Sequence, residues 1–327
     1  MDISVVIPSY NRADLLPSTL DAILSQTASP REVIVVDDGS RDDTLAVLAR
    51  YQSSVRVITI ENSGSIVARN VGLRAAVGTL VAFCDSDDLW RPDFLERMTV
   101  LWSAEPRTRV AYANFHIVRE GVWSTETKFD EAPPGYWDSL RLVGEGIGVF
   151  DQPIVDRVIR WQPFFQSALI VDRATMLRAG GWDEGVGRTI GDDFGTVLRL
   201  AELLPFGVLF APLAGIRKHP GNFSANVRAM NLGDANILEY VLASRPSLAG
   251  HAALIQESVA QRRRDALHSA FADGDFAAVR AIYQRLPAAL KSMRIQLKRR
   301  VSGLPSPLAT AVTRVLSKLD RWRGNRT

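Results

Sequence analysis

Three carboxylates crowd into the short segment Asp85-Ser86-Asp87-Asp88. The residues just before it, 80–84, are all apolar and are typical of a buried strand. Carboxylates gathered at a strand end repel one another unless a cation lies among them. Mg²⁺ and Mn²⁺ prefer oxygen ligands, often one or two carboxylates together with substrate phosphates. The segment is therefore a candidate metal–diphosphate site, although an acidic turn alone would also explain it.

Three other polar clusters follow strand-like runs of apolar residues. They are Ser9-Tyr10-Asn11, Asp37-Asp38-Gly39-Ser40 and Asn62-Ser63-Gly64. Apolar residues at helical spacing separate these runs, and strands that alternate with helices predict a mostly parallel sheet covered on both faces. Because ligands bind at the carboxyl ends of such strands, the clusters predict a site at one edge of the sheet.

The pattern changes after the acidic segment. Residues 110–118 and 122–127 predict an antiparallel hairpin turning at Glu120-Gly121, and residues from about 230 onward are mostly helical in pattern. Residues 130–165 are rich in Gly, Pro and Trp and carry no assignment. We expect a catalytic domain over 1–228, with a donor half (1–100) and an acceptor half (101–228), followed by a helical region over 229–327.

Four of these stretches resemble, in order, the motifs of family 2 glycosyltransferases. They are residues 4–12 (Ser-Val-Val-Ile-Pro-Ser-Tyr-Asn-Arg), 33–44, 62–72 and 83–90, and together they span roughly 3–95. The resemblance implies an α/β protein of the GT-A, Rossmann-like fold. Its mostly parallel central sheet would be flanked by helices, and here it would carry a helical C-terminal extension.

The resemblance also implies a nucleotide-sugar site and a metal. Asp87 would ligate Mn²⁺ or Mg²⁺, and Tyr10 would stack on the base. Carboxylates can accept hydrogen bonds from a base N–H or a ribose hydroxyl. The residues implied to bind the donor nucleotide are Pro8, Tyr10, Asn11, Asp37, Asp38, Asn62, Gly64, Arg69, Asp85 and Ser86. For each acid alone, capping of a turn is the alternative interpretation.

The second half is similar to two further family segments. Residues 180–184 (Gly-Gly-Trp-Asp-Glu) match a Gly-Gly-aromatic-Asp-Glu segment, and Asp192-Asp193 matches a Glu-Asp pair that opens a helix, with Asp192 where Glu is usual. Asp193 falls at the position of the catalytic base. A carboxylate at a helix N-terminus lies in a field that keeps it ionised and able to accept a proton. Helix capping is the alternative role.

A single histidine stands in a family-like context. His219 follows Arg217-Lys218 in a segment similar to one whose histidine approaches the metal or the diphosphate. We therefore expect His219 to be a second metal ligand, and Arg217 and Lys218 to offset the charge of the leaving diphosphate. A lone histidine in a structural role is the alternative.

Together these features predict an inverting, metal-assisted hexosyltransferase. The donor would be a UDP-, dTDP- or GDP-sugar, and the acceptor a glycan or a lipid-linked glycan in bacterial surface polysaccharide or glycolipid synthesis. Two alternatives stay open. One is a nucleotidyltransferase that makes a nucleotide-sugar, and the other is a non-catalytic nucleotide-sugar-binding protein.

The charge is unevenly distributed along the 327 residues. Residues 288–327 hold ten Lys/Arg and one acid, a net charge of +9, whereas the whole chain carries +3. Leu308, Val312, Val315, Leu316 and Leu319 follow helical spacing. Such a basic amphipathic helix could lie on an anionic membrane, pack on the catalytic domain or contact another subunit. No nucleic-acid recognition fold accompanies the charge, so we expect no nucleic-acid partner.

The location follows from what the sequence contains. It holds one cysteine, Cys84, and lacks both an apolar run of membrane-spanning length and an N-terminal secretory pattern. We expect a cytoplasmic protein, and a peripheral position on the inner face of the cell membrane is one of the alternatives that the basic tail leaves open.

Overall fold

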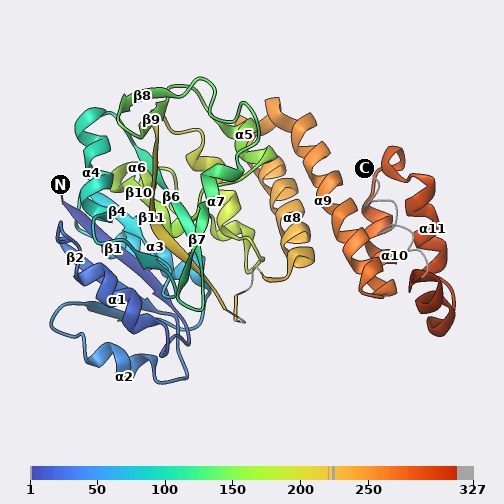
Figure 1. Ribbon diagram of the computed structural model, residues 1–327, viewed down its shortest axis with the longest axis horizontal. Coiled ribbons are helices and arrows are strands. Elements are labelled where there is room, and N and C mark those ends of the chain that lie inside the picture. Colours follow the sequence, from blue (N-terminus) through green and yellow to red (C-terminus); the bar gives the residue numbers. More distant parts are fainter. Residues whose placement is uncertain (1, 220, 223–224, 315–327) are drawn as a thin grey trace. The chain divides into compact units, whose positions relative to one another are not determined.

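The computed structural model describes residues 2–219, 221–222 and 225–314 (Figure 1). The chain forms two compact units. Unit 1 comprises Met1–Arg188 and Asp193–Asn222, and unit 2 comprises Thr189–Asp192 and Phe223–Thr327. The boundary at 228 and the donor and acceptor halves stay predictions.

Unit 1 is built on one sheet with a parallel N-terminal part. Its first four strands pair in parallel in the order β3-β2-β1-β4; β1, β2 and β4 are almost wholly buried, whereas the edge strand β3 is largely exposed. They are β1 (Ile3–Ser9), β2 (Glu32–Asp37), β3 (Arg56–Thr59) and β4 (Leu80–Phe83). The connecting helices are α1 (Leu16–Leu24), α2 (Thr44–Ala49) and α3 (Ser65–Ala75). The alternating strands and helices predicted from the sequence are confirmed here.

Beyond β4 the same sheet becomes mixed. β10 runs antiparallel to both β4 and β6, β11 runs parallel to β6, and β9 and β8 extend the sheet antiparallel. The strands are β5 (Leu89–Trp90), β6 (Val110–Arg119), β7 (Val122–Thr127), β8 (Arg141–Gly144), β9 (Ile147–Phe150), β10 (Leu169–Asp172) and β11 (Phe206–Lys218). The predicted hairpin is β6–β7. The prediction of a mostly parallel sheet thus holds for the N-terminal strands.

The helices of the second half surround this mixed part of the sheet. They are α4 (Phe94–Ala104), α5 (Val155–Arg160), α6 (Arg173–Arg178) and α7 (Asp193–Leu200). The short strand β5, directly after the acidic segment, pairs with the middle of β11 through Trp90 and Ala214. This pairing brings the end of β11, more than a hundred residues later in the chain, next to the acids.

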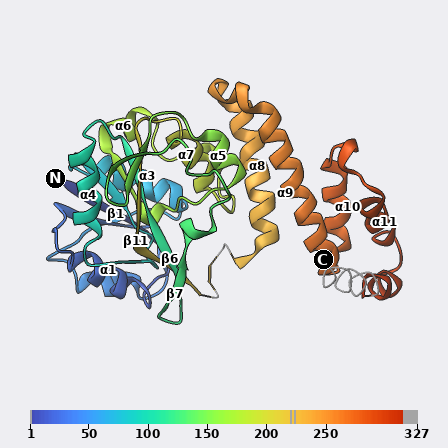
Figure 2. The same cartoon turned by 45° about the horizontal axis from the view of Figure 1, so that its top comes forward.

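Unit 2 is helical, as the sequence predicts for residues beyond 230. Its helices are α8 (Val227–Ser244), α9 (Ala252–Ala272), α10 (Phe276–Arg285) and α11 (Met293–Val301), and α8 lies beside α9 (Figure 2). The ion pair Arg262–Asp234 (2.6 Å) joins α9 to α8. In the described part of the chain, no helix is both long and apolar enough to cross a bilayer.

Candidate active site

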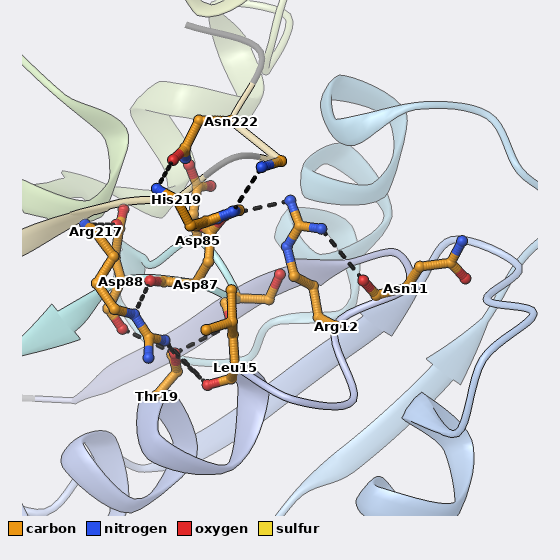
Figure 3. Close-up of polar contacts among 12 residues, drawn as sticks. Asn11, Arg12, Leu15, Thr19, Asp85, Asp87, Asp88, Arg217, His219 and Asn222 are labelled. Carbon is orange, nitrogen blue, oxygen red and sulfur yellow. Dashed lines mark hydrogen bonds and ion pairs between the residues drawn. The ribbon is translucent and has the colours of Figure 1, made fainter. Parts of the chain in front are cut away.

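The acidic segment follows β4 at the carboxyl edge of the parallel strands (Figure 3). One ligand oxygen from each of Asp85, Asp87 and Asp88 lies within 4.8 Å of the others. The three carboxylates have different neighbours, however, and these neighbours separate their roles.

Asp88 is turned inward and fixes the loop. It is buried, and its Oδ2 accepts a hydrogen bond from Ser167 Oγ (2.5 Å) while its Oδ1 accepts one from the backbone N–H of Arg217 (2.9 Å). Burial and the neighbouring carboxylates of Asp87 and Asp85 raise the pKa of Asp88 well above its usual range. Asp88 therefore ties β11 to the residues before β10 and serves to hold the acidic loop.

Asp85 lies on the side of Arg69. Its carboxylate accepts hydrogen bonds from Arg69 Nη2 (2.6 Å) and from Gln166 Nε2 (2.9 Å). The Arg69 guanidinium also lies over the Trp182 ring, 4.9 Å from its centroid. Two predicted donor residues, Arg69 and Asp85, are thus in contact, and the cation offsets the charge of the first acid.

Asp87 faces the opposite side of the loop. Its Oδ2 lies 3.3 Å from Arg12 Nη2 and 3.0 Å from His219 Nε2. Its side chain is partly accessible, at 13% exposure. The predicted pair of metal ligands, Asp87 and His219, is therefore in direct contact although the two residues are far apart in sequence.

The hydrogen bonds of His219 define its tautomer. Nδ1 accepts from the backbone N–H of Gly221 (3.1 Å), so a neutral ring carries its proton on Nε2 and donates it to Asp87. A metal bound through Nε2 needs the other tautomer, in which Nδ1 is protonated. Ligation by His219 would therefore break the contact with Gly221.

Arg217 braces the acidic loop against α1. Its guanidinium donates to the backbone carbonyl of Leu15 (3.0 Å), to Ser18 Oγ (2.6 Å) and to Thr19 Oγ1 (2.7 Å), and its Nε contacts the carbonyl of Asp87 (Figure 3). The expectation that Arg217 faces the diphosphate does not fit these contacts, because the guanidinium points into α1. The cation that lies beside the Asp87 carboxylate is Arg12.

Replacing Arg217 by Met should loosen Asp87 as well as the fold. The variant removes several hydrogen bonds from a charged donor, and each of these contributes about 1.5–3 kcal/mol. Mispositioning a metal ligand typically weakens metal affinity about 10–100-fold. Calorimetry with Mn²⁺ and thermal unfolding measure the two effects.

Arg157→Met is the control, because Arg157 similarly donates to the carbonyls of Gly135 (2.9 Å) and Asp138 (2.7 Å). It should lose stability only, and wild-type Mn²⁺ affinity in the Arg217 variant would contradict the brace.

The predicted nucleotide loops are interlocked around Asp38. Its carboxylate accepts hydrogen bonds from the backbone N–H groups of Ser63 (2.6 Å) and Gly64 (2.8 Å) and from Asn62 Nδ2 (3.2 Å). Gly64 has φ +97°, a conformation that favours glycine. Three predicted donor residues are thus brought together, and in this arrangement Asp38 shapes the loop.

The first loop is held against the second in the same way. The backbone N–H of Asn11 donates to Ser40 Oγ (2.9 Å), and Asn11 Oδ1 accepts from the N–H of Arg41 (2.8 Å). Tyr10 is exposed, whereas Asp37 is fully buried and accepts from the N–H of Ser40 (3.2 Å). Of these residues, Tyr10 is therefore the one with a ring accessible for stacking.

The other predicted donor residues are structural neighbours of the same edge. Pro8 lies in β1 opposite Val36, and Ser86 is buried with its carbonyl accepting from Thr19 Oγ1 (3.1 Å). The predicted donor residues thus lie along this edge, and they differ in burial: Asp37 and Ser86 are buried, whereas Tyr10 is exposed.

Asp193 begins α7. The fully buried hydroxyl of Tyr112 is within the electrostatic reach of both Asp193 and Arg69. After burial, the charge of Asp193 is the next contribution that raises the pKa of Tyr112, while Arg69 lowers it. This shared neighbour connects the predicted base with the Arg69–Asp85 pair.

The Gly-Gly-Trp segment is fastened to the neighbouring helix α3. Asn70 Nδ2 donates to the carbonyl of Trp182 (2.9 Å), and Asn70 Oδ1 accepts from its N–H (2.8 Å). A Cβ on Gly181 would lie 2.4 Å from Asn70 Oδ1, which explains a glycine there. This contact joins a donor motif of the first half to a segment of the second.

Sequence reasoning missed several residues of the site. Gln166 donates a hydrogen bond to Asp85, and Ser167 donates one to Asp88. Arg188 donates to the backbone carbonyl of Asn62, which is distant in the sequence. These residues stand in stretches without a recognisable pattern. Arg12 was within a matching motif, but only the pairing of its guanidinium with Asp87 in the structure indicates a role.

The donor set fits a hard divalent cation. Carboxylate oxygens at a strand end are ligands that Mn²⁺ and Mg²⁺ accept; Asp85 and Asp87 are both partly accessible here, and an imidazole lies beside Asp87. When bound there, the cation would place positive charge where substrate phosphates can reach it.

The fold and this edge define a class: an α/β protein with interlocked loops and an acidic cluster at the carboxyl ends of parallel strands. Residues 4–159 match the sequence profile of glycosyl transferase family 2. The part of the chain that carries the acidic site therefore belongs to glycosyl transferase family 2 and has the GT-A fold.

Individual relatives agree with this assignment. The chain is 34% identical over 123 residues to WfaP of Escherichia coli, which is named as a UDP-Glc:alpha-D-GlcNAc-diphosphoundecaprenol beta-1,3-glucosyltransferase. The matching region covers 37% of this chain and 48% of WfaP. The chain spans less than half the length of the first curated relatives it matches.

Solved structures show a similar fold. TarS of S. aureus, crystallised with UDP, has a TM-score of 0.61 at 17% identity, covering 96% of this chain and 92% of that one. The mannosyltransferase PcManGT of Pyrobaculum calidifontis, in complex with GDP-Man and Mn²⁺, has a TM-score of 0.53 at 20% identity, covering 97% and 87%.

Proposed function

We propose that the chain transfers a hexose from a nucleoside-diphosphate sugar to an acceptor hydroxyl, with inversion at the anomeric carbon. The observation that carries the proposal is the division of labour within the acidic segment. Asp88 is buried and holds the loop, Asp85 is paired with Arg69, and Asp87 is partly accessible beside Arg12 and His219.

The donor would bind along the interlocked loops at the sheet edge. Tyr10 would stack on the base, and the backbone around Asn11 and Asn62 would enclose the nucleoside. Asp87, with His219 in its other tautomer, would hold a Mn²⁺ or Mg²⁺ ion whose charge offsets that of the diphosphate leaving group. Arg12 would turn from Asp87 to a phosphate oxygen, because a guanidinium binds either anion.

Asp193 would act as the general base. Its position at the start of α7 favours the ionised carboxylate, which accepts the proton of the acceptor hydroxyl. The acceptor oxygen forms a bond to the anomeric carbon as the bond from that carbon to the diphosphate oxygen breaks, and its electron pair leaves with the nucleoside diphosphate. One displacement inverts the configuration, so no side chain becomes covalently attached to the sugar.

A lipid-linked glycan is the acceptor that we favour. The curated relative WfaP is named for a diphosphoundecaprenol-linked acceptor. Such acceptors are embedded in a membrane, and nucleotide-sugars are cytoplasmic metabolites. We therefore place the reaction in surface polysaccharide or glycolipid synthesis, at the inner face of the cell membrane.

The stereochemistry of the first product formed tests this reaction. Proton NMR, recorded before the products mutarotate, should show the anomeric configuration opposite to that of the donor sugar. A product that retains the donor configuration would contradict direct displacement with Asp193 as base. Release of pyrophosphate with formation of a nucleotide-sugar would instead favour the nucleotidyltransferase alternative.

A further inference from the structure

The final described segment of unit 2 presents an exposed apolar face bordered by basic residues. On α11, Met293 is 88% exposed and Leu297 is 44% exposed. Their spacing of four residues places both on the same side of the helix. Ile295 points the other way, into the core of unit 2. The exposed residues are therefore not simply the outer part of that core.

The same character continues after α11. Residues 306–314 are helical, with Ala309 buried in the unit 2 core and Leu308 52% exposed, while Leu304 in the preceding turn is 40% exposed. Two successive helices thus each bury one face and expose leucine or methionine on another. The tail residues Val315, Leu316, Leu319 and Trp322 lie outside the described residues.

The charges around this face are of one sign. Residues 288–314 contain six Lys/Arg and no Asp or Glu, and Arg294 and Arg300 on α11 are exposed. The acids on the neighbouring elements are engaged elsewhere: Asp275 and Asp273 pair with Arg228 at 3.0 and 3.8 Å. A hollow of about 900 Å³ beside the face is lined in part by Arg280 and Arg299, which extend the positive charge.

We propose that the exposed side of α11, formed by Met293 and Leu297 with Arg294 and Arg300 at its border, binds the surface of an anionic phospholipid bilayer, and that Leu304 and Leu308 add to this binding. Apolar side chains enter the boundary between headgroups and acyl chains, and guanidinium groups stay at the phosphates. A second protein surface would need complementary acids or a matching apolar patch. The uniform positive charge, without any acid among residues 288–314, favours lipid phosphate instead.

The proposal goes beyond sugar transfer and is independent of it. Binding to vesicles is measured with the full chain and no substrate, and donor turnover is measured on the same sample. If the wild-type chain did not bind anionic vesicles but turned over the donor normally, that result would count against the lipid face alone.

The experiment is co-sedimentation with vesicles of phosphatidylcholine, with and without about 30% phosphatidylglycerol. The wild-type chain should bind the anionic vesicles at least about tenfold more tightly than the neutral ones, and salt should weaken this binding. The double variants Met293→Gln/Leu297→Gln and Arg294→Gln/Arg300→Gln should each lower binding about tenfold or more.

The controls carry the same substitutions on unit 1. Leu45 is 45% exposed and Val77 58% exposed, and Arg50 and Arg160 are exposed as well. Leu45→Gln/Val77→Gln and Arg50→Gln/Arg160→Gln should bind vesicles as the wild type does. Equal binding of wild type to neutral and anionic vesicles would overturn the proposal. So would unaltered binding by both face variants, or a dimer in light scattering that the Met293/Leu297 variant abolishes while vesicle binding stays unchanged.

Discussion

Asp193→Asn is expected to reduce kcat about 10²–10⁴-fold while donor affinity changes little, because this is the typical contribution of general base catalysis. Asn keeps the size and polarity of the side chain but cannot take the proton of the acceptor hydroxyl. The proposed donor-binding loops are held by Asp38, which accepts from Ser63 and Gly64, and by Asp85, which accepts from Arg69. None of these hydrogen bonds involves Asp193. Steady-state kinetics, together with calorimetry of donor binding, separates the two effects.

Asp93→Asn is the matched control for this substitution. Asp93 stands at the start of α4 and its carboxylate pairs only loosely with Arg97 (3.8 Å), so it repeats the chemical change at a helix start outside the site. It should leave kcat unchanged. Wild-type turnover in Asp193→Asn would mean that the base is another group.

The second large effect is expected from Asp87→Asn. Asp87 is the partly accessible acid that contacts His219, whereas Asp85 is paired with Arg69, so the loss of Asp87 should lower Mn²⁺ affinity by more than the about 10–100-fold typical of residues that only support a ligand. Stability should not fall, because removing one of three crowded carboxylates relieves repulsion among them. Calorimetry with Mn²⁺ and thermal unfolding in the absence of metal measure the two quantities.

Asp88→Asn is the internal comparison and should behave in the opposite way. Both of its carboxylate oxygens accept hydrogen bonds, from Ser167 and from the N–H of Arg217, whereas the amide of Asn keeps one acceptor oxygen and turns the other into an NH₂ donor. A buried donor left without a partner costs about 1–3 kcal/mol, so the free energy of unfolding should fall. If Asp87→Asn bound Mn²⁺ as tightly as the wild type and Asp88→Asn did not, the assignment of the two acids would be reversed.

The sequence predicted the parallel half of the fold because its signals are local. Each of the first four strands is a short, mainly apolar run that ends in a polar cluster. The spacing of the apolar residues and the residues that end each run can be read within the segment, without knowing which strands pair with it. The mixed half was harder to predict. β8 and β9 lie in the stretch 130–165, where Gly, Pro and aromatic residues obscure the alternation of apolar and polar side chains. β8 pairs with β9, and β9 pairs with the distant β11.

The candidate site shows the same division. Asp85, Asp87 and Asp88 could be located from their spacing, but their separate roles depend on partners from other segments. Ser167 and Arg217 turn Asp88 inward, and Arg69 and Gln166 hold Asp85. A run of three acids carries no information on which of them is buried, because that depends on how β5 and β10 bring later residues to the edge.

Arg217 illustrates how a residue type alone can mislead. Next to a histidine and a lysine, an arginine suggests phosphate binding. Here β11 ends beside α1, where the carbonyl of Leu15 and the hydroxyls of Ser18 and Thr19 supply acceptors for the guanidinium. The register between β5 and β11 sets this contact, and register cannot be read from a single segment.

The most direct test of metal-assisted sugar transfer is the product released from a panel of UDP-, dTDP- and GDP-sugars, with Mn²⁺, with Mg²⁺ and with a chelator. The proposed site predicts that one of these donors yields a nucleoside diphosphate, slowly with water and faster with an acceptor. Release should require the cation and be lost in Asp87→Asn. Release of pyrophosphate, or of nucleoside diphosphate at equal rates with the chelator and in Asp87→Asn, would contradict it.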